Sequence, residues 1–85
     1  NYPNPFNPST KINFSLPQTE QVTLKIYDIT GKEIITLVNQ KFDAGKYTAD
    51  WAGLDGNGVS VSSGVYFYKI IAGNNIQTKR MVLIK

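Results

Sequence analysis

Apolar and polar residues alternate with a period of two along two early segments of the chain. The apolar positions of the first segment, residues 10–16, are Ile12, Phe14 and Leu16. Those of the second, residues 21–28, are Val22, Leu24 and Ile26. A period of two places successive side chains on opposite faces of a strand. Both segments are therefore predicted to be half-buried β-strands.

The rest of the chain predicts further short strands separated by turns. Three of these strands cover residues 33–38, 46–51 and 76–85, and a weaker one is expected near residues 59–61. Residues 64–72 are apolar on both faces, which predicts a central strand. Residues 39–45 are expected to form a loop. Asp28–Lys32 is expected to form a hairpin turn in which Gly31 adopts a positive φ.

The strand count predicts an all-β fold. Six to seven short strands recur at spacings near ten residues, every connection is short, and no segment has a helical pattern. Together these features predict one immunoglobulin-like antiparallel β-sandwich. In the last strand, Met81 and Leu83 have the opposite parity to Ile76. A β-bulge near Lys79 is expected to reconcile the two sets.

The first residues differ in composition from the rest. Three of the four prolines fall in the opening eight residues, and proline fits neither a helix nor a central strand. We expect residues 1–9 to form an extended arm, anchored by Tyr2 and Phe6, and residues 10–85 to form the sandwich. Because the chain begins without Met and stops inside a strand-like run, we expect a fragment that carries the natural C-terminus of a longer protein.

Composition limits the chemistry that these 85 residues can perform. The chain has no Cys and no His, so it lacks a thiolate, a disulfide and the commonest general base and metal ligand. No apolar run is long enough for a membrane-spanning helix, so membrane insertion is not expected. The net charge is +3, but the cations are scattered, which argues against nucleic-acid binding.

Two groups of residues are candidate binding sites. Asp50, Asp55 and Asn57 lie near three glycines and could suggest a calcium loop, but the EF-hand spacing is absent and a turn bonded by its own Asx side chains is favoured. Trp51 and the aromatic run Tyr66–Tyr68 could form a sugar-stacking platform, but we favour the core for Trp51 and one face of the run. The sequence thus predicts no catalytic residues, no cofactor and no metal.

Five blocks of sequence together resemble a known family, the type A C-terminal sorting domains of type IX (Por) secretion cargo proteins. The blocks are Asn4–Thr10, Val22–Lys32, Ala44–Tyr47 with Trp51, Ser63–Lys69 and Lys79–Lys85. The stretch from Trp51 to Tyr68 is also similar to the immunoglobulin-like domain of flagellar hook-capping proteins. The family's Trp-Asp-Gly becomes Trp51-Ala52-Gly53 in this chain.

The resemblance implies an exported address label rather than an enzyme. Its implied partners are outer-membrane secretion machinery and a sortase-like peptidase that cuts upstream of Asn1, and its implied location is the cell surface or the medium. The sorting-signal candidates are Gly31, Lys32, Gly64, Lys79, Arg80, Met81, Val82, Leu83, Ile84 and Lys85. For the glycines, turn geometry alone is the competing interpretation.

Two other functions remain open at this point. One is a structural or assembly module whose exposed edge strands pair with a neighbouring copy. The other is a carbohydrate-binding module. A sorting label is expected to be a monomer, although its edge strands would allow self-association.

Overall fold

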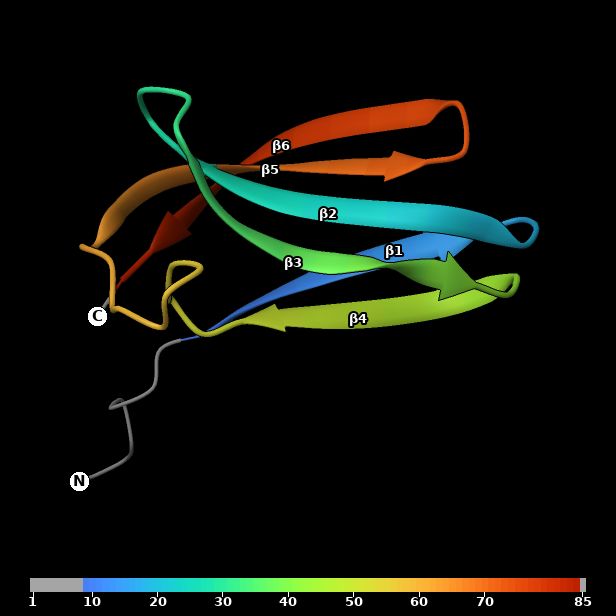
Figure 1. Cartoon of the computed structure of the whole chain (residues 1–85), viewed down its shortest axis with the longest axis horizontal. Helices are drawn as coiled ribbons and strands as arrows, with labels where there is room; N and C mark the ends of the chain where they lie inside the picture. Colours follow the sequence, from blue (N-terminus) through green and yellow to red (C-terminus); the bar gives the residue numbers. More distant parts are fainter. Residues whose placement is uncertain (1–8, 85) are drawn as a thin grey trace.

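The computed structural model describes residues 9–84, which form six strands and no helix (Figure 1). The strands are β1 Thr10–Leu16, β2 Glu20–Asp28, β3 Glu33–Phe42, β4 Gly45–Trp51, β5 Gly64–Ala72 and β6 Asn75–Leu83. Within the described part of the chain there is accordingly no helix that could cross a membrane. The expected arm anchors Tyr2 and Phe6, and the terminal Lys85, lie outside the described residues.

The six strands form two antiparallel sheets packed face to face. One sheet contains β1 and β4, and the other has the order β3-β2-β5-β6 (Figure 1). The all-β, immunoglobulin-like antiparallel sandwich is therefore confirmed. The apolar strand β5 lies inside its sheet, between β2 and β6, as its two-sided hydrophobicity predicts.

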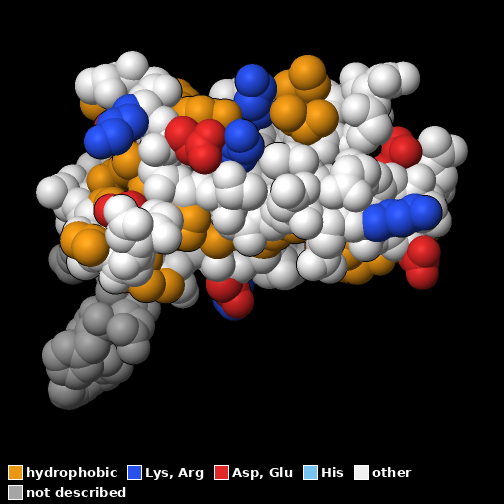
Figure 2. Space-filling model, viewed as in Figure 1, with side chains coloured by type: hydrophobic (Ala, Val, Ile, Leu, Met, Phe, Trp, Pro, Cys, Tyr) orange, Lys and Arg blue, Asp and Glu red, His pale blue; other side chains and the backbone are white. Residues whose placement is uncertain are grey.

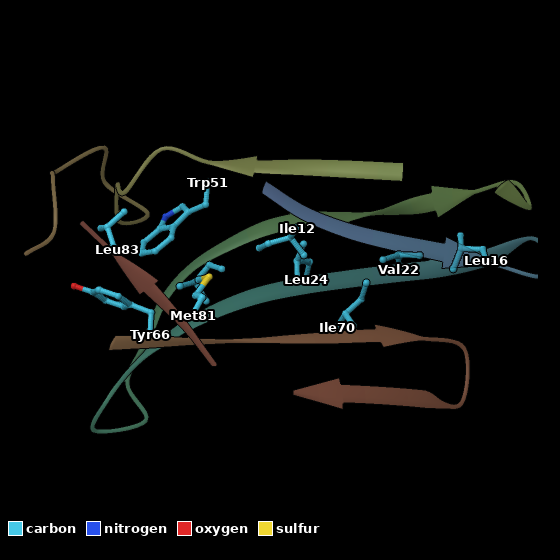
Figure 3. Close-up of a cluster of buried hydrophobic side chains, with 10 residues drawn as sticks. Ile12, Leu16, Val22, Leu24, Trp51, Tyr66, Ile70, Met81 and Leu83 are labelled. Carbon is cyan, nitrogen blue, oxygen red and sulfur yellow. The ribbon is translucent and has the colours of Figure 1, made fainter. Parts of the chain in front are cut away.

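The core follows the period-two pattern of the strands. Inward-facing apolar side chains from both sheets, with Trp51 at one end, make up one buried cluster (Figure 3). Its members are Ile12, Leu16, Val22, Leu24, Ile26, Trp51, Tyr66, Ile70, Met81 and Leu83. No polar side chain of the described residues is buried. Removal of this apolar surface from water is the main force that holds the two sheets together.

Trp51 occupies the core rather than a surface platform. Its ring is 1% exposed and meets Tyr66 edge to face, with ring centroids 5.0 Å apart. Such edge-to-face pairs add to the free energy that burial supplies. The core interpretation of Trp51 is thus confirmed, and this ring cannot serve as a sugar-stacking surface.

The predicted loop at residues 39–45 is wrong, because β3 continues to Phe42. Residues 39–41 have no apolar alternation, but they pair with β2 at the edge of the sheet, where polar side chains face water. Gln21 Nε2 donates to Asn39 Oδ1 at 3.0 Å across this pair. At residues 59–61, where a weak strand was expected, the structure has only an isolated bridge between Leu54 and Ser60.

The predicted bulge near Lys79 is also wrong. β5 and β6 pair in one unbroken register, from Gly64 opposite Leu83 to Ala72 opposite Asn75. The apolar residues of β6 change parity without a bulge, because residues 75–80 are all exposed and the two-stranded β1–β4 sheet does not cover them. Only Met81 and Leu83 reach the core. The observed register shifts lie instead in the β2–β3 pair, beside Leu24 and Ile26.

Leu83 and Val82 offer a matched test of this arrangement. Leu83 is 2% exposed and Val82 is 52% exposed, although they are neighbours in β6. We expect Leu83→Ala to lower the free energy of unfolding by about 2–4 kcal/mol, since it leaves a cavity. Val82→Thr keeps a β-branched side chain on the outer face and should change it by less than about 0.5 kcal/mol. Urea denaturation of both variants would measure this, and equal losses would contradict the assigned faces.

Candidate functional site

The structure gathers most of the predicted sorting-signal residues at one end of the sandwich. Gly31 and Lys32 form the β2–β3 turn, and Asp28 before them lies opposite Tyr66 of β5. Gly64 begins β5 and lies opposite Leu83 of β6. Met81–Ile84 therefore runs toward the same end of the sandwich, on the other side of β5 from that turn, whereas Lys79 and Arg80 lie further back along β6. We call this end the turn end; it comprises residues 28–32, 52–64 and 82–84.

The loop of residues 52–63 accepts hydrogen bonds from two aromatic side chains that belong to the core. Trp51 Nε1 donates to the carbonyl oxygen of Leu54 at 2.9 Å, and Tyr66 Oη donates to that of Ser62 at 2.7 Å. Burial, aided by the charge of Asp28, raises the pKa of Tyr66, which favours this protonated donor. The loop is thus held in place by two core aromatic residues.

Two turns at this end repeat one design, which the sequence patterns alone did not reveal. In each, an aspartate Oδ1 accepts hydrogen bonds from the backbone N–H groups two and four residues ahead: Asp28 from Thr30 and Lys32, and Asp55 from Asn57 and Val59. Each turn also ends with a glycine at positive φ, Gly31 at +89° and Gly58 at +79°. The signal that could have found the pair is the shared spacing Asp-x-x-Gly.

The two turns lie close together. The backbone N–H of Gly56 donates to the carbonyl oxygen of Ile34 at 2.9 Å, which ties the second turn to the strand that follows the first. Between them is a hollow of about 480 Å³, whose polar lining includes Asp28, Lys32 and Asp55. Among residues 9–84, no three His, Cys, Asp or Glu side chains are grouped to hold a metal ion. The expected turn bonded by Asx side chains is confirmed for Asp55.

Backbone conformation accounts for the presence of glycine at both candidate positions. Gly31 has φ +89° and Gly64 has φ +154°, values that side chains other than glycine rarely adopt. A Cβ atom at either position would meet nothing within 4 Å. Conformation rather than crowding therefore selects glycine there, and the space beside both residues is open to a partner.

Exposed apolar side chains concentrate at the turn end. The large exposed apolar residues of the described chain are Ile29, Leu54, Val59, Ile76, Val82 and Ile84, and all but Ile76 lie there. Figure 2 shows apolar side chains at the left of the view, where this end lies. Ile29 is 72% exposed and Ile84 is 76% exposed. Ile29 lines a hollow with Phe67, Lys69 and Thr78, whereas Ile84 follows the end of β6, so these side chains share one end of the sandwich rather than one patch.

The Asp28 turn predicts a dependence of stability on pH. The Thr30 hydroxyl, 2.6 Å from Oδ1, is the largest influence and holds the pKa of Asp28 below its ordinary value of 3.8, while desolvation, the next largest, opposes it. The backbone N–H groups of Lys32 and Thr30 act in the same direction. Ionised Asp28 therefore stabilises the folded state fully above the unfolded pKa, and this contribution is lost as pH falls through the lowered folded pKa.

Urea midpoints measured between pH 7 and about pH 2 would test this dependence. We expect Asp28→Asn to be less stable than the unsubstituted domain at pH 7 and to approach it at the acidic limit. Thr30→Val removes the hydroxyl donor and should raise the pKa of Asp28 toward 3.8. A gap between the Asp28→Asn variant and the unsubstituted domain that stays constant with pH would contradict the assignment.

Comparisons with known proteins agree with the fold and identify the family. The family described as the secretion system C-terminal sorting domain matches residues 1–85, so the chain belongs to this family. Among solved structures, FlgD from P. aeruginosa is similar, with a TM-score of 0.69 and 22% sequence identity. That similarity, which shows the fold alone, covers 88% of this chain and 59% of the FlgD chain. No curated protein matches.

The family assigns a general role to the chain. As a C-terminal sorting domain, it is a signal for secretion, and its protein is exported to the cell surface or the medium. The chain that carries this signal is a folded domain, since strands extend from Thr10 to Leu83.

Proposed function

We propose that this domain directs a larger cargo protein across the outer membrane to the cell surface through the type IX secretion system. The observation that carries the proposal is the family match over residues 1–85. In this role the domain is a substrate of the export machinery and of a sortase-like peptidase, and it catalyses nothing itself. Its recognition depends on Gly31, Lys32, Gly64 and the segment Lys79–Lys85.

The turn end supports this choice of residues. It combines an open turn at Gly31-Lys32, an open backbone at Gly64 and the exposed side chains of Val82 and Ile84. In β6 the inward residues Met81 and Leu83 build the core, while the outward residues between and after them remain accessible. One short segment can therefore both complete the fold and present a surface to a receptor.

Removal of residues 79–85 would be a poor test, because it also removes two core side chains. A sharper variant is Val82→Ser with Ile84→Ser, fused to the C-terminus of a reporter in a host competent for type IX secretion. If a receptor buries both side chains, their loss should reduce surface display by about tenfold or more. Whole-cell immunofluorescence of the reporter measures the display.

Gln40→Ser with Thr48→Ser is the control for this experiment. It also places two serines on exposed positions, but on β3 and β4, away from the turn end and from β6. It should be displayed like the unsubstituted fusion, and all variants should have similar thermal midpoints as purified domains. Undiminished display of the Val82 and Ile84 variant would show that the turn end is not the recognition surface, and no display of any fusion would reject the proposed function.

The free strand edges favour one second candidate, an assembly module that pairs with further copies of itself. β3, β6, β1 and β4 all have one unpaired edge among the described strands. A sorting label should instead remain a monomer of 9.5 kDa. We expect sedimentation equilibrium to give this mass at every accessible concentration, and reversible growth in mass with concentration would favour the assembly module.

A further inference from the structure

The free edge of β6 differs from the other free edges of the sandwich. Native proteins usually protect such edges with bulges, prolines, very short strands or charged side chains. β3 has two register shifts against β2, and β1 is followed directly by Pro17. β4 is regular but has only seven residues, whereas β6 pairs with β5 over nine residues without a shift, contains no proline and is protected by charge alone. β6 is therefore the long, regular edge on which a further strand can form.

A groove runs beside this edge. On the side of the sandwich formed by β3 and β4, three packed rings leave a hollow of only about 230 Å³: Phe42 lies 5.5 Å from Phe14 and 4.6 Å from Tyr47, between ring centroids. The opposite side, between β1 and β6, holds an open groove of about 570 Å³. Its apolar lining comes from Phe14, Leu16, Pro17, Ile70, Ala72 and Ile76.

The groove fits the side chains of an added strand. A strand paired with β6 projects alternate side chains to either face of the sheet. On the inner face they would extend over the groove, beside Gln77 and Ile70, and would cover apolar surface that the two-stranded sheet leaves open. Main-chain pairing would supply affinity, and the groove would supply selectivity.

The charged side chains of β6 itself are of one sign, although Glu20 of β2 lines the groove beside this strand. Residues 56–85 contain no Asp or Glu, although Lys69 lies in β5 and Lys79 and Arg80 lie in β6. The register places Lys69 opposite Thr78, so Lys69 and Arg80 share the outer face, while Lys79 points to the inner face. Within residues 9–84 none of these three cations forms an ion pair. Both faces of the edge therefore carry a positive charge that no ion pair neutralises, and the acid of the groove, Glu20, lies beside Gly73 at the hairpin between β5 and β6.

This charge argues against a second copy of the chain as the occupant. Two β6 edges placed side by side would bring the Lys79-Arg80 pairs of both copies into one sheet, and like charges on neighbouring strands are destabilising. An acidic strand would gain from the same groups. The cations thus block self-pairing and leave the edge open to a partner of opposite charge.

We propose that β6 binds an extended acidic strand of a partner protein, which adds to the β3-β2-β5-β6 sheet as a fifth strand. Two adjacent acids of that strand lie beside Lys79 and Arg80, one on each face, and an apolar side chain further along covers the groove. This inference rests on the proposed function, because it takes the partner to be a protein of the export machinery. It adds the chemistry by which that protein recognises the last strand.

A peptide titration of the 85-residue chain tests strand binding directly. The probe is a synthetic ten-residue peptide of alternating Thr and Val with Asp-Glu at its centre, and the comparison peptide has Lys-Lys there. We expect amide NMR shifts confined to β6 and the groove, with the Asp-Glu peptide binding about tenfold more tightly than the Lys-Lys peptide. No binding of the Asp-Glu peptide, or shifts centred on the edge of β1, β3 or β4, would overturn the inference.

Charge reversal separates recognition from folding. Lys79→Glu with Arg80→Glu changes only exposed side chains and should reverse the preference, so that the Lys-Lys peptide binds more tightly. The matched control, Lys41→Glu with Lys46→Glu, makes the same change in net charge on exposed residues of β3 and β4. This control should keep the original preference. If the Lys79 and Arg80 variant still prefers the Asp-Glu peptide, the proposal is overturned. Loss of folding cannot explain that result, because an unfolded variant would prefer neither peptide.

The same two variants in the reporter fusion distinguish this inference from the proposed function. The variant reversed at Lys79 and Arg80 should lose surface display, while the control retains it. If the unsubstituted fusion and the reversed variant are displayed equally, strand recognition through these cations is wrong and the sorting role stands. If the unsubstituted fusion is not displayed, the sorting role fails, and the peptide titration still decides whether β6 binds an acidic strand.

Discussion

The packing of Trp51 against the end of β6 is the contact on which the turn end depends. Trp51 is almost fully buried, its ring meets Tyr66, and its Nε1 holds the carbonyl oxygen of Leu54. Gly53, just beyond, comes so close to Leu83 that an added Cβ would lie 3.2 Å from its Cδ2. In a chain without cysteine, this apolar contact rather than a covalent link fastens the long loop and the last strand to the sheets.

Because of that contact, the end of β6 has side chains of two kinds, which alternate along the strand. Met81 and Leu83 fill the core, whereas Val82 and Ile84 face outward, and further back the strand leaves the cover of the small sheet altogether. Because side chains alternate between the two faces of a strand, inward residues of β6 stabilise the fold while the outward residues beside them are free for recognition. Damage to the C-terminal segment can affect secretion through either set, so truncations alone would confuse loss of fold with loss of signal.

The sequence predicted the strands well where apolar and polar residues alternate strongly. It predicted them less well where backbone pairing and the packing of the two sheets determine the structure. The strands with Leu24 and Ile70 were predicted because buried apolar residues mark them directly. The end of β3 was not, since Asn39, Gln40 and Lys41 form an edge strand through backbone pairing that no side-chain pattern reveals. The expected bulge at Lys79 failed for a related reason: parity indicates which way a side chain points, but not whether another layer covers it. Likewise, the position of the Asp28 turn beside the Asp55 turn depends on contacts between residues that are distant in sequence.

The two-residue connection of β5 and β6, at Gly73-Asn74, has a bearing on the order of folding. Gly73 adopts φ +59°, as tight hairpin turns require, and the strands it joins are neighbours in sequence. The β1–β4 pair joins residues that are 29 to 41 positions apart, from Leu16 with Gly45 to Thr10 with Trp51. Local hairpins close in microseconds, while distant pairings must first overcome a larger loss of chain entropy. We therefore expect the positively charged edge to form early, so that a partner strand could engage it before the second sheet has closed over the core.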